Sequence, residues 1–172
     1  VQFNRRFVMK NGTVMANPGK VYPPLGHESA RPAGPTDPTL PRLYLDNPDG
    51  KALATAVNFA IHLDTTGGHS YSADIPYAMG RILRWVKGAD MATQFTYAAA
   101  GNINHYDLLD PEHPRRVKGY GEAARIGALI AAGVLRGYDH LQVVSYPTVR
   151  VSREYVPLEL DATAAAKMRE RH

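Results

Sequence analysis

Residues 43–62 decide the fold, and they read LYLDNPDGKALATAVNFAIH. The segment Asn47-Pro48-Asp49-Gly50 has the composition of a tight turn, because proline and glycine supply the backbone angles that a turn needs. Apolar residues precede this turn at 43–45, and an alternating run follows it over 52–62. The stretch predicts two paired strands, with one face of the second strand packed on the core. That face carries Leu53, Thr55, Val57, Phe59 and Ile61.

Two helical patterns follow this hairpin. Asp74 is suited to cap the first helix, and Pro76 is tolerated in its first turn. Apolar residues then recur at helical spacing before Gly88, which predicts a helix packed on the sheet. A buried strand is expected over 91–99. The second helix is expected from about 119 to 136, ending at Gly137, and its many glycines and alanines permit a close approach of backbones.

The remaining segments complete the predicted fold. Asn11-Gly12 between 7–10 and 13–16 is a strong hairpin signal. The prolines of residues 18–41 predict a long loop without regular structure. Residues 141–156 are a strand candidate interrupted by Pro147, and Asp161 is a candidate cap for a terminal helix. We therefore predict an α/β fold, a mixed β-sheet with flanking helices, in a single domain over 1–172 with the Pro-rich loop 18–41 within it.

Composition excludes several classes of protein. The 172 residues include no cysteine, so disulfide frameworks, Cys-ligated zinc and iron–sulfur clusters are excluded. The net charge of +4 is too small to indicate a nucleic-acid partner by itself. The longest apolar run covers 126–135, far short of the ~20 residues that span a bilayer. The sequence has no Gly-x-Ser-x-Gly motif, no phosphate-binding loop and no dinucleotide fingerprint.

Residues 58–68, NFAIHLDTTGG, are the most suggestive for chemistry. They take an apolar strand into His62, Asp64, two threonines and two glycines. A histidine at a strand end is well positioned, and neighbouring glycines let a ligand approach closely. Neutral imidazole is a good zinc ligand, and zinc with an open position activates water. The alternative is a histidine that only forms a hydrogen bond at the edge of the sheet.

Two other segments are candidates. In the polar loop 101–107, Asn102 and Asn104 can donate to an oxyanion, and His105 can titrate near neutral pH. The alternative for this loop is an Asx-turn that satisfies its own backbone. Near the start, Arg5 and Arg6 can hold a carboxylate or phosphate, but neighbouring residues of a strand point to opposite faces. The basic run 115–118 is interpreted as a solvated linker.

Four blocks of sequence, in order, resemble the neutral (non-lysosomal) ceramidases. Asn4-Arg5 with Asn17-Pro18 is similar to the family's Asn-Arg-Ser and Asn-Pro segment. Residues 37–62 resemble its sheet segment ending in Asn-Phe-Ala-x-His. Residues 72–77 are similar to its Ser-Gly-Asp helix entry, with the tyrosine shifted by one position. Residues 99–104, AAGNIN, resemble its Ala-Gly-Asp-Val-Ser-Pro loop. The resemblance covers roughly residues 1–150, the middle of the family's catalytic domain, and is stronger still to ceramidase-like hypothetical proteins of bacteria.

The resemblance implies a zinc-dependent hydrolase that cleaves the N-acyl bond of a small-molecule or lipid amide. His62 falls on a zinc-ligand histidine, and Arg5 falls on an arginine that contacts the substrate near the scissile amide. Asn104 stands where the family has a serine beside the metal. An amide can orient water or stabilise an oxyanion together with Asn102, but it cannot act as a nucleophile. Water activated by a metal does not strictly need that serine.

The resemblance supplies one zinc ligand where a catalytic site normally has three from the protein. The family's other ligands are an upstream His-x-His pair and a downstream Glu and Tyr, whereas the first histidine of this sequence is His27. Asp64, His69 or His105 can serve as further zinc ligands, although their spacing does not require this role. The chain begins at Val1 and has no signal-peptide pattern. We expect a fragment of a longer hydrolase, inactive alone, whose site is completed by the rest of the polypeptide or a partner chain.

Two other functions remain open at this stage. The same α/β scaffold can be a non-catalytic binding or assembly module in which His62 is structural. A third interpretation, an anion- or nucleic-acid-binding domain that uses Arg5, Arg6 and the run 115–118, is weakened by the interspersed acidic residues. No transmembrane segment and no nucleic-acid partner are therefore expected, and the resemblance favours a secreted or periplasmic protein.

Overall fold

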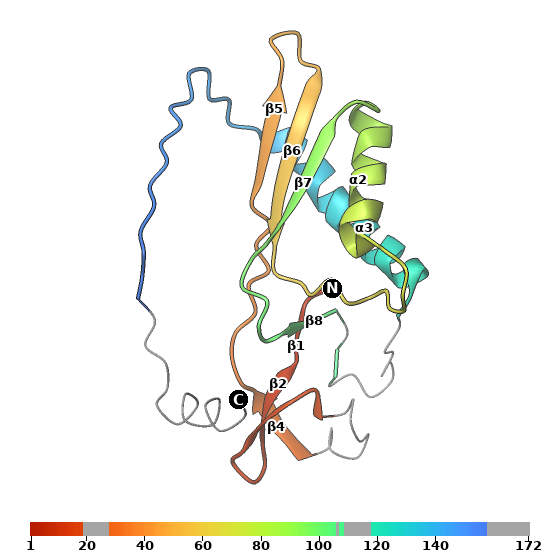
Figure 1. The fold of residues 1–172 in the computed structure, drawn as a ribbon, viewed down its shortest axis with the longest axis vertical. Coiled ribbons are helices and arrows are strands. Elements are labelled where there is room, and N and C mark those ends of the chain that lie inside the picture. Colours follow the sequence, from red (N-terminus) through yellow and green to blue (C-terminus); the bar gives the residue numbers. More distant parts are fainter. Residues whose placement is uncertain (19–27, 106, 109–117, 158–172) are drawn as a thin grey trace, which may run out of the picture. The chain divides into compact units, whose positions relative to one another are not determined.

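The structure is a computed structural model that describes residues 1–18, 28–105, 107–108 and 118–157 (Figure 1). The chain forms two compact units, Val1–Leu141 and Gln142–His172. All helices and strands of the described residues lie in the first unit. The expectation of a single domain over 1–172 stays a prediction.

The hairpin predicted from residues 43–62 forms one side of a three-stranded sheet. Strand β5 (Arg42–Asp46) pairs antiparallel with β6 (Ala52–Phe59), and β6 pairs parallel with β7 (Ala92–Tyr97). Gly50 in the connecting turn has φ of +79°, which glycine adopts without strain. The parallel pair requires a crossover, and helix α2 supplies it. The prediction of a mixed sheet with flanking helices is confirmed.

The expected alternation along β6 is wrong at Leu53, which is 50% exposed. The register of β5 against β6 shifts between Leu45 and Asp46, which pair with Ala54 and Ala52. Leu53 is thus an extra residue on its strand, and such a bulge changes the face that the following residues occupy. Beyond the bulge, Thr55, Val57 and Phe59 are buried as predicted. The strand ends at Phe59, and residues 60–62 continue without ladder pairing.

Strand β7 is shorter and more exposed than the buried strand expected over 91–99. Its burial alternates between exposed and half-buried residues, and only Met91, just before it, is fully buried. It is an edge strand with β6 on one side only, so one side of its backbone has no partner strand.

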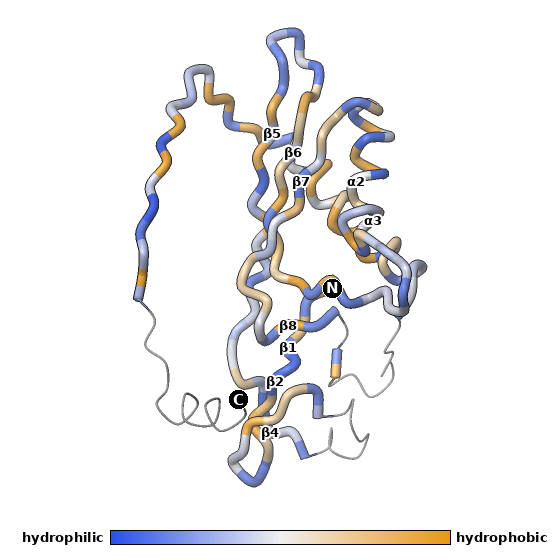
Figure 2. The backbone as a smooth tube through the Cα atoms, in the orientation of Figure 1, coloured by the Kyte–Doolittle hydropathy of each residue, from blue (hydrophilic) through white to orange (hydrophobic). Residues whose placement is uncertain are grey.

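Two helices pack together over this sheet. Helix α2 (Asp74–Lys87) ends at Gly88 as predicted, and α3 (Tyr120–Gly137) is followed by a short 3₁₀ helix, η2 (Tyr138–His140). Figure 2 shows hydrophobic residues along the strands and helices and a hydrophilic β5–β6 turn. One core joins sheet and helices, and its fully buried members include Val57, Ile61, Ile75, Met79, Leu83, Ile126 and Val134.

Asp74 differs slightly from its predicted role as the residue that precedes the helix. It is the first residue of α2, follows Ala73 as the cap, and has a left-handed φ of +51°. Its carboxylate nevertheless accepts the N–H of Ile75 at 2.8 Å, so it satisfies one of the free amide groups of the first turn.

Two small sheets complete the first unit. Strand β2 (Arg6–Met9) pairs antiparallel with β3 (Val14–Ala16), as the Asn11-Gly12 signal predicts, and with β4 (Ser29–Pro32). Strand β4 corrects the expectation that residues 18–41 hold no regular structure. Pro32 is tolerated there because β4 is an edge strand, whose outer side needs no donor. Strands β1 (Phe3–Asn4) and β8 (Ile103–Asn104) pair antiparallel.

The strand predicted over 141–156 is wrong. The described residues of the second unit, 142–157, contain no strand or helix. The alternate valines there find no sheet or core to cover them, and Val143, Val149 and Val151 are all at least 84% exposed. The terminal helix expected after Asp161 lies outside the described residues. Within the described part of the chain, no helix is long and apolar enough to span a membrane.

Candidate functional site

The β1–β8 pair joins the segments that carry Arg5 and Asn102. Asn4 is opposite Ile103, and Phe3 is opposite Asn104. The backbone N–H of Arg5 donates to the Asn102 carbonyl at 2.8 Å, and the Arg5 Nε donates to the Gly101 carbonyl at 2.9 Å. Two residues 97 positions apart in sequence, 5 and 102, are thus in direct contact. The sequence named both residues, but only the strand pairing shows that they meet.

The side-chain amide of Asn102 forms hydrogen bonds within the protein. Its Nδ2 donates to the Oδ1 of Asn4 and to the Pro35 carbonyl, each at 3.1 Å. Asn4 in turn donates to the Gly34 carbonyl at 2.8 Å. These bonds fasten the residues after β4 to the loop that begins β8. A catalytic part for Asn102 stays a prediction, and in the arrangement observed its amide hydrogens serve the scaffold.

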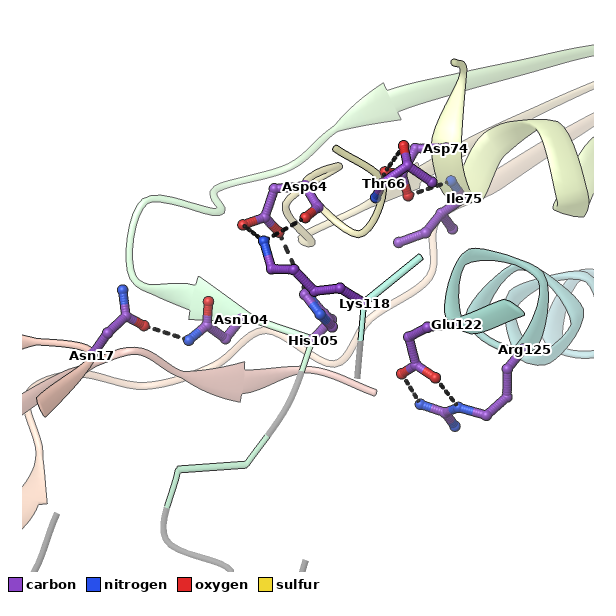
Figure 3. A network of polar contacts seen from close by, with 10 residues as sticks. All are labelled: Asn17, Asp64, Thr66, Asp74, Ile75, Asn104, His105, Lys118, Glu122 and Arg125. Carbon is purple, nitrogen blue, oxygen red and sulfur yellow. Dashed lines mark hydrogen bonds and ion pairs between the residues drawn. The ribbon is translucent and has the colours of Figure 1, made fainter. Parts of the chain in front are cut away.

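Asn104 is only 3% exposed, and its Nδ2 donates to the Oδ1 of Asn17 at 2.6 Å (Figure 3). Asn17 also donates its backbone N–H to the Arg5 carbonyl. Asn17 has φ of +52°, a left-handed conformation that asparagine tolerates better than most residues. The Asn-Pro block at 17–18 and the 102–104 loop therefore support one another, which explains how distant segments build one site.

This contact leads to a prediction for Asn17. Replacing it by alanine removes the acceptor of a buried amide and places a Cβ in the left-handed region, so we expect a loss of about 1–2 kcal/mol. Asn17→Gly removes the same acceptor without the backbone penalty and is expected to cost less. Urea unfolding of the two variants measures the difference. Equal stability of both variants and the unmodified chain would show that the Asn17–Asn104 bond contributes nothing.

His62 follows the end of β6 and is half-buried, with its Nε2 enclosed. Among the described residues, no group forms a hydrogen bond with that nitrogen. Burial lowers the pKa of His62, the positive charges of Arg5 and His105 lower it further, and the carboxylate of Asp64 opposes them. The imidazole is therefore kept neutral at neutral pH, which is the form that coordinates a metal ion.

A polar cluster consists of Asp64, His105 and Lys118 (Figure 3), and two of its members, Asp64 and His105, act electrostatically on His62. The Oδ1 of Asp64 is 3.4 Å from the Nδ1 of His105, whose side chain is fully buried. The Oδ2 of Asp64 is 3.8 Å from the Nζ of Lys118, which also donates to the Asp64 carbonyl at 3.0 Å. From the sequence, Asp64 and His105 were named as possible further zinc ligands, but Lys118 was placed in a solvated linker. Nothing in the local sequence shows that Lys118 reaches Asp64.

The loop after His62 is fastened at three further points. The N–H of Gly119, just before α3, donates to the Thr65 carbonyl at 2.7 Å. The Oδ2 of Asp74 accepts both the N–H and the hydroxyl of Thr66, at 2.8 and 2.9 Å. Both helices thus hold the backbone that continues from His62, so the imidazole is carried by a rigid segment.

Glu122 is a buried acid that the sequence did not single out. It is 7% exposed and forms a two-point ion pair with Arg125, at 2.6 and 2.8 Å. This pairing holds the pKa of Glu122 below its usual value against the effect of burial, and the charge of His105 adds to the lowering. Its only sequence signal was the acid-base spacing of three residues at a helix start, which is common on helix surfaces.

The described residues fit a zinc site only in part. The enclosed and unpartnered Nε2 of His62 suits one metal bond. Within the part of the chain that the structure describes, no three histidine, aspartate or glutamate residues are gathered closely enough to hold a metal ion. His62 thus fits as one ligand, and the full set expected of a zinc site is not assembled from these residues.

The basic residues that are candidates for binding an anion differ in their position and contacts. Arg6 is exposed on β2, whereas Arg5 donates to the loop at 101. Lys118 is engaged by Asp64, and 115–117 lie outside the described residues. The contacts of the described basic residues therefore add no support to the nucleic-acid interpretation.

Comparisons with known proteins give one structural likeness. No family model matches the chain, and no curated protein matches it. Among solved structures, a similar chain is the neutral ceramidase from Pseudomonas aeruginosa, with 19% sequence identity and a TM-score of 0.52. The likeness covers 61% of this chain, which spans only 17% of the length of that ceramidase. At this identity the comparison shows fold alone: part of this chain has a distant ceramidase-like fold.

Proposed function

We propose that this chain is the segment of a zinc-dependent hydrolase that contributes His62 as a metal ligand. The single observation that carries the proposal is the His62 Nε2, an enclosed imidazole nitrogen with no hydrogen-bond partner among the described residues. An unsatisfied buried nitrogen is costly unless something binds it, and a metal ion is the partner for which imidazole is suited. Bound zinc would supply activation of a water molecule.

The substrate class we propose is an N-acyl amide, and Arg5 is the residue that faces it. Arg5 is fixed to the 101–102 loop through its backbone and its Nε. Its two terminal guanidinium nitrogens have no hydrogen-bond acceptor among the described residues, so they are able to donate to a substrate carbonyl and to stabilise the negative charge that develops on it. Asn104 is held by Asn17 and positions the wall of the site.

The chain's part in hydrolysis is then limited and specific. His62 holds the metal, and Arg5 polarises the carbonyl. The Asp64–His105–Lys118 cluster keeps the loop after His62 in place. Because two further ligands are needed, the remainder of the site belongs to another part of the polypeptide or to a partner chain.

The experiment is zinc binding by the 172-residue chain, measured by equilibrium dialysis and metal analysis. Because the further ligands lie outside the described residues, we expect weak, saturable zinc binding by the unmodified chain and its loss in His62→Ala. His140→Ala is the matched control, because the 18-residue helix α3 separates His140 in η2 from Lys118 of the cluster, and zinc should be retained. Circular dichroism verifies that each variant is folded. A folded chain without zinc, or with zinc unaffected by His62→Ala, would contradict the proposal and favour a non-catalytic binding or assembly module.

A further inference from the structure

A groove of about 760 Å³ lies on the first unit at helices α2 and α3. It is lined by the loop before α2 and by both helices, which contribute alanines to it. The lining is mainly aromatic and small, and its larger side chains are Tyr71, Tyr77, Arg81, Ile82, Trp85 and Tyr120. The volume lies within the roughly 300–1,000 Å³ of pockets that bind small molecules.

The spacing of α2 explains the groove. Tyr77, Arg81 and Trp85 recur every four residues, so they lie along one face of the helix. This face is not the one that packs on the sheet, which carries Ile75, Met79 and Leu83. Large aromatic side chains on a solvent-facing stripe do not stabilise the core, and Trp85 is 87% exposed. A concentration of exposed aromatic residues around a hollow indicates a binding surface.

The groove has one available charge, and that charge is positive. Arg81 lies over the ring of Tyr77 at 5.7 Å, and no carboxylate of the described residues forms an ion pair with it. The other charged residue of the lining, Asp74, is 6% exposed and already accepts hydrogen bonds from Thr66 and Ile75. A ligand in the groove therefore meets apolar walls and a single guanidinium.

We propose that this groove binds an amphiphile with one aliphatic chain and an anionic head group, of the class of a long-chain carboxylate. The carboxylate pairs with the Arg81 guanidinium, a geometry in which arginine donates two hydrogen bonds. The aliphatic chain lies along Tyr77, Ile82 and Trp85 and is removed from water there. This inference goes beyond the proposed hydrolase function and does not depend on zinc or on His62.

Trp85 makes the test direct, because it is the single tryptophan of the chain. Dodecanoate is titrated into the protein below the concentration at which it forms micelles, and the tryptophan emission is recorded. We expect a saturable blue shift as the aliphatic chain excludes water from the indole. Dodecyltrimethylammonium, with the same chain and the opposite charge, is expected to bind about fivefold or more weakly. Octanoate, with a shorter chain, is expected to bind more weakly as well.

Two variants isolate the role of the charge. Arg81→Gln should weaken dodecanoate binding by about fivefold, the effect of one partly exposed ion pair. Arg136→Gln removes the same charge from an exposed residue of α3 that does not line the groove and should leave binding unchanged. No saturable shift, equal affinity for the cationic amphiphile, or equal effects of the two substitutions would each overturn the proposal.

The outcome is separable from that of the zinc experiment. His62→Ala is expected to bind dodecanoate with the affinity of the unmodified chain, because His62 does not line the groove. A folded His62→Ala protein that has lost zinc but retains the tryptophan shift supports both proposals. Loss of the dodecanoate shift in that variant would contradict the assignment of the binding site to this groove.

Discussion

The substitution Gly127→Ala is expected to destabilise the chain by about 2–3 kcal/mol, although alanine is the better helix former. A Cβ at this position would lie 2.7 Å from the Cβ of Ala78 and 2.8 Å from the Ile75 carbonyl oxygen and the Met79 nitrogen. Two of these atoms belong to the backbone of α2, which cannot move aside as a flexible side chain does. The helices would have to separate and disturb the core between them and the sheet.

Gly121→Ala is the matched control, since it introduces the same methyl group into the same helix. No atom lies within 4 Å of a Cβ at that position. Its stability is expected to be unchanged or slightly higher, because alanine loses less conformational entropy than glycine. Urea unfolding followed by circular dichroism compares both variants. A Gly127→Ala protein as stable as Gly121→Ala would show that α2 and α3 do not meet as closely as the structure has them.

Asp74→Ala is expected to cost about 2–3 kcal/mol, because one carboxylate holds both the start of α2 and the loop after His62. It accepts the N–H and hydroxyl of Thr66 and the N–H of Ile75, and it is 6% exposed. Alanine would leave these donors buried without an acceptor and would occupy a left-handed φ of +51°. Thermal or urea unfolding measures the loss.

Asp37→Ala is the control for this prediction. Asp37 accepts the N–H and hydroxyl of Thr39 in the same way, at 3.0 and 2.7 Å, but it is fully exposed to water. Water replaces the carboxylate there, so little change in stability is expected. If Asp37→Ala were as destabilising as Asp74→Ala, burial of the Asp74 contacts would not be the cause.

The Asp74 contribution also has a predicted pH dependence. Burial alone would raise the pKa of Asp74, but the hydrogen bonds from Thr66 and Ile75 outweigh it and leave the pKa below the ordinary 3.8. A carboxyl group whose pKa is lower in the folded state stabilises the fold fully at pH values above its unfolded-state pKa. That stabilisation is lost as the pH falls through the folded-state pKa. The stability difference between the unmodified chain and Asp74→Ala should therefore be constant above about pH 5 and shrink below pH 3.8.

The sequence was informative where local chemistry decides structure. The Asn11-Gly12 and Asp49-Gly50 turns, the stop at Gly88 and the small residues around Gly127 each act on their own neighbours, and the structure contains all four features. The exposed position of Leu53 was missed because a bulge depends on the register of the partner strand. The strand predicted after 141 was wrong because alternating valines form a strand only where another strand or a core receives them.

The candidate site was predictable as a set of residues but not as an arrangement. His62, Arg5, Asn102 and Asn104 were named from local pattern and resemblance, yet the contacts of Arg5, Asn102 and Asn104 join segments far apart in the sequence. The Lys118–Asp64 contact and the burial of Glu122 had no local signal that distinguishes them from surface charges. The aromatic groove was visible in part, since Tyr77, Arg81 and Trp85 share helical spacing, but its other wall comes from α3.

The most direct test of the central claim observes the His62 ring itself. Long-range ¹H–¹⁵N spectra of the ¹⁵N-labelled chain are recorded while zinc is added, and His62→Ala identifies the signal. The account predicts that the chemical shift of the His62 Nε2 changes as zinc is added and reaches a plateau. The signals of the histidines other than His62 and His105 are expected to stay unchanged. An unchanged His62 Nε2 signal in the presence of excess zinc would contradict the claim that this nitrogen is a metal ligand.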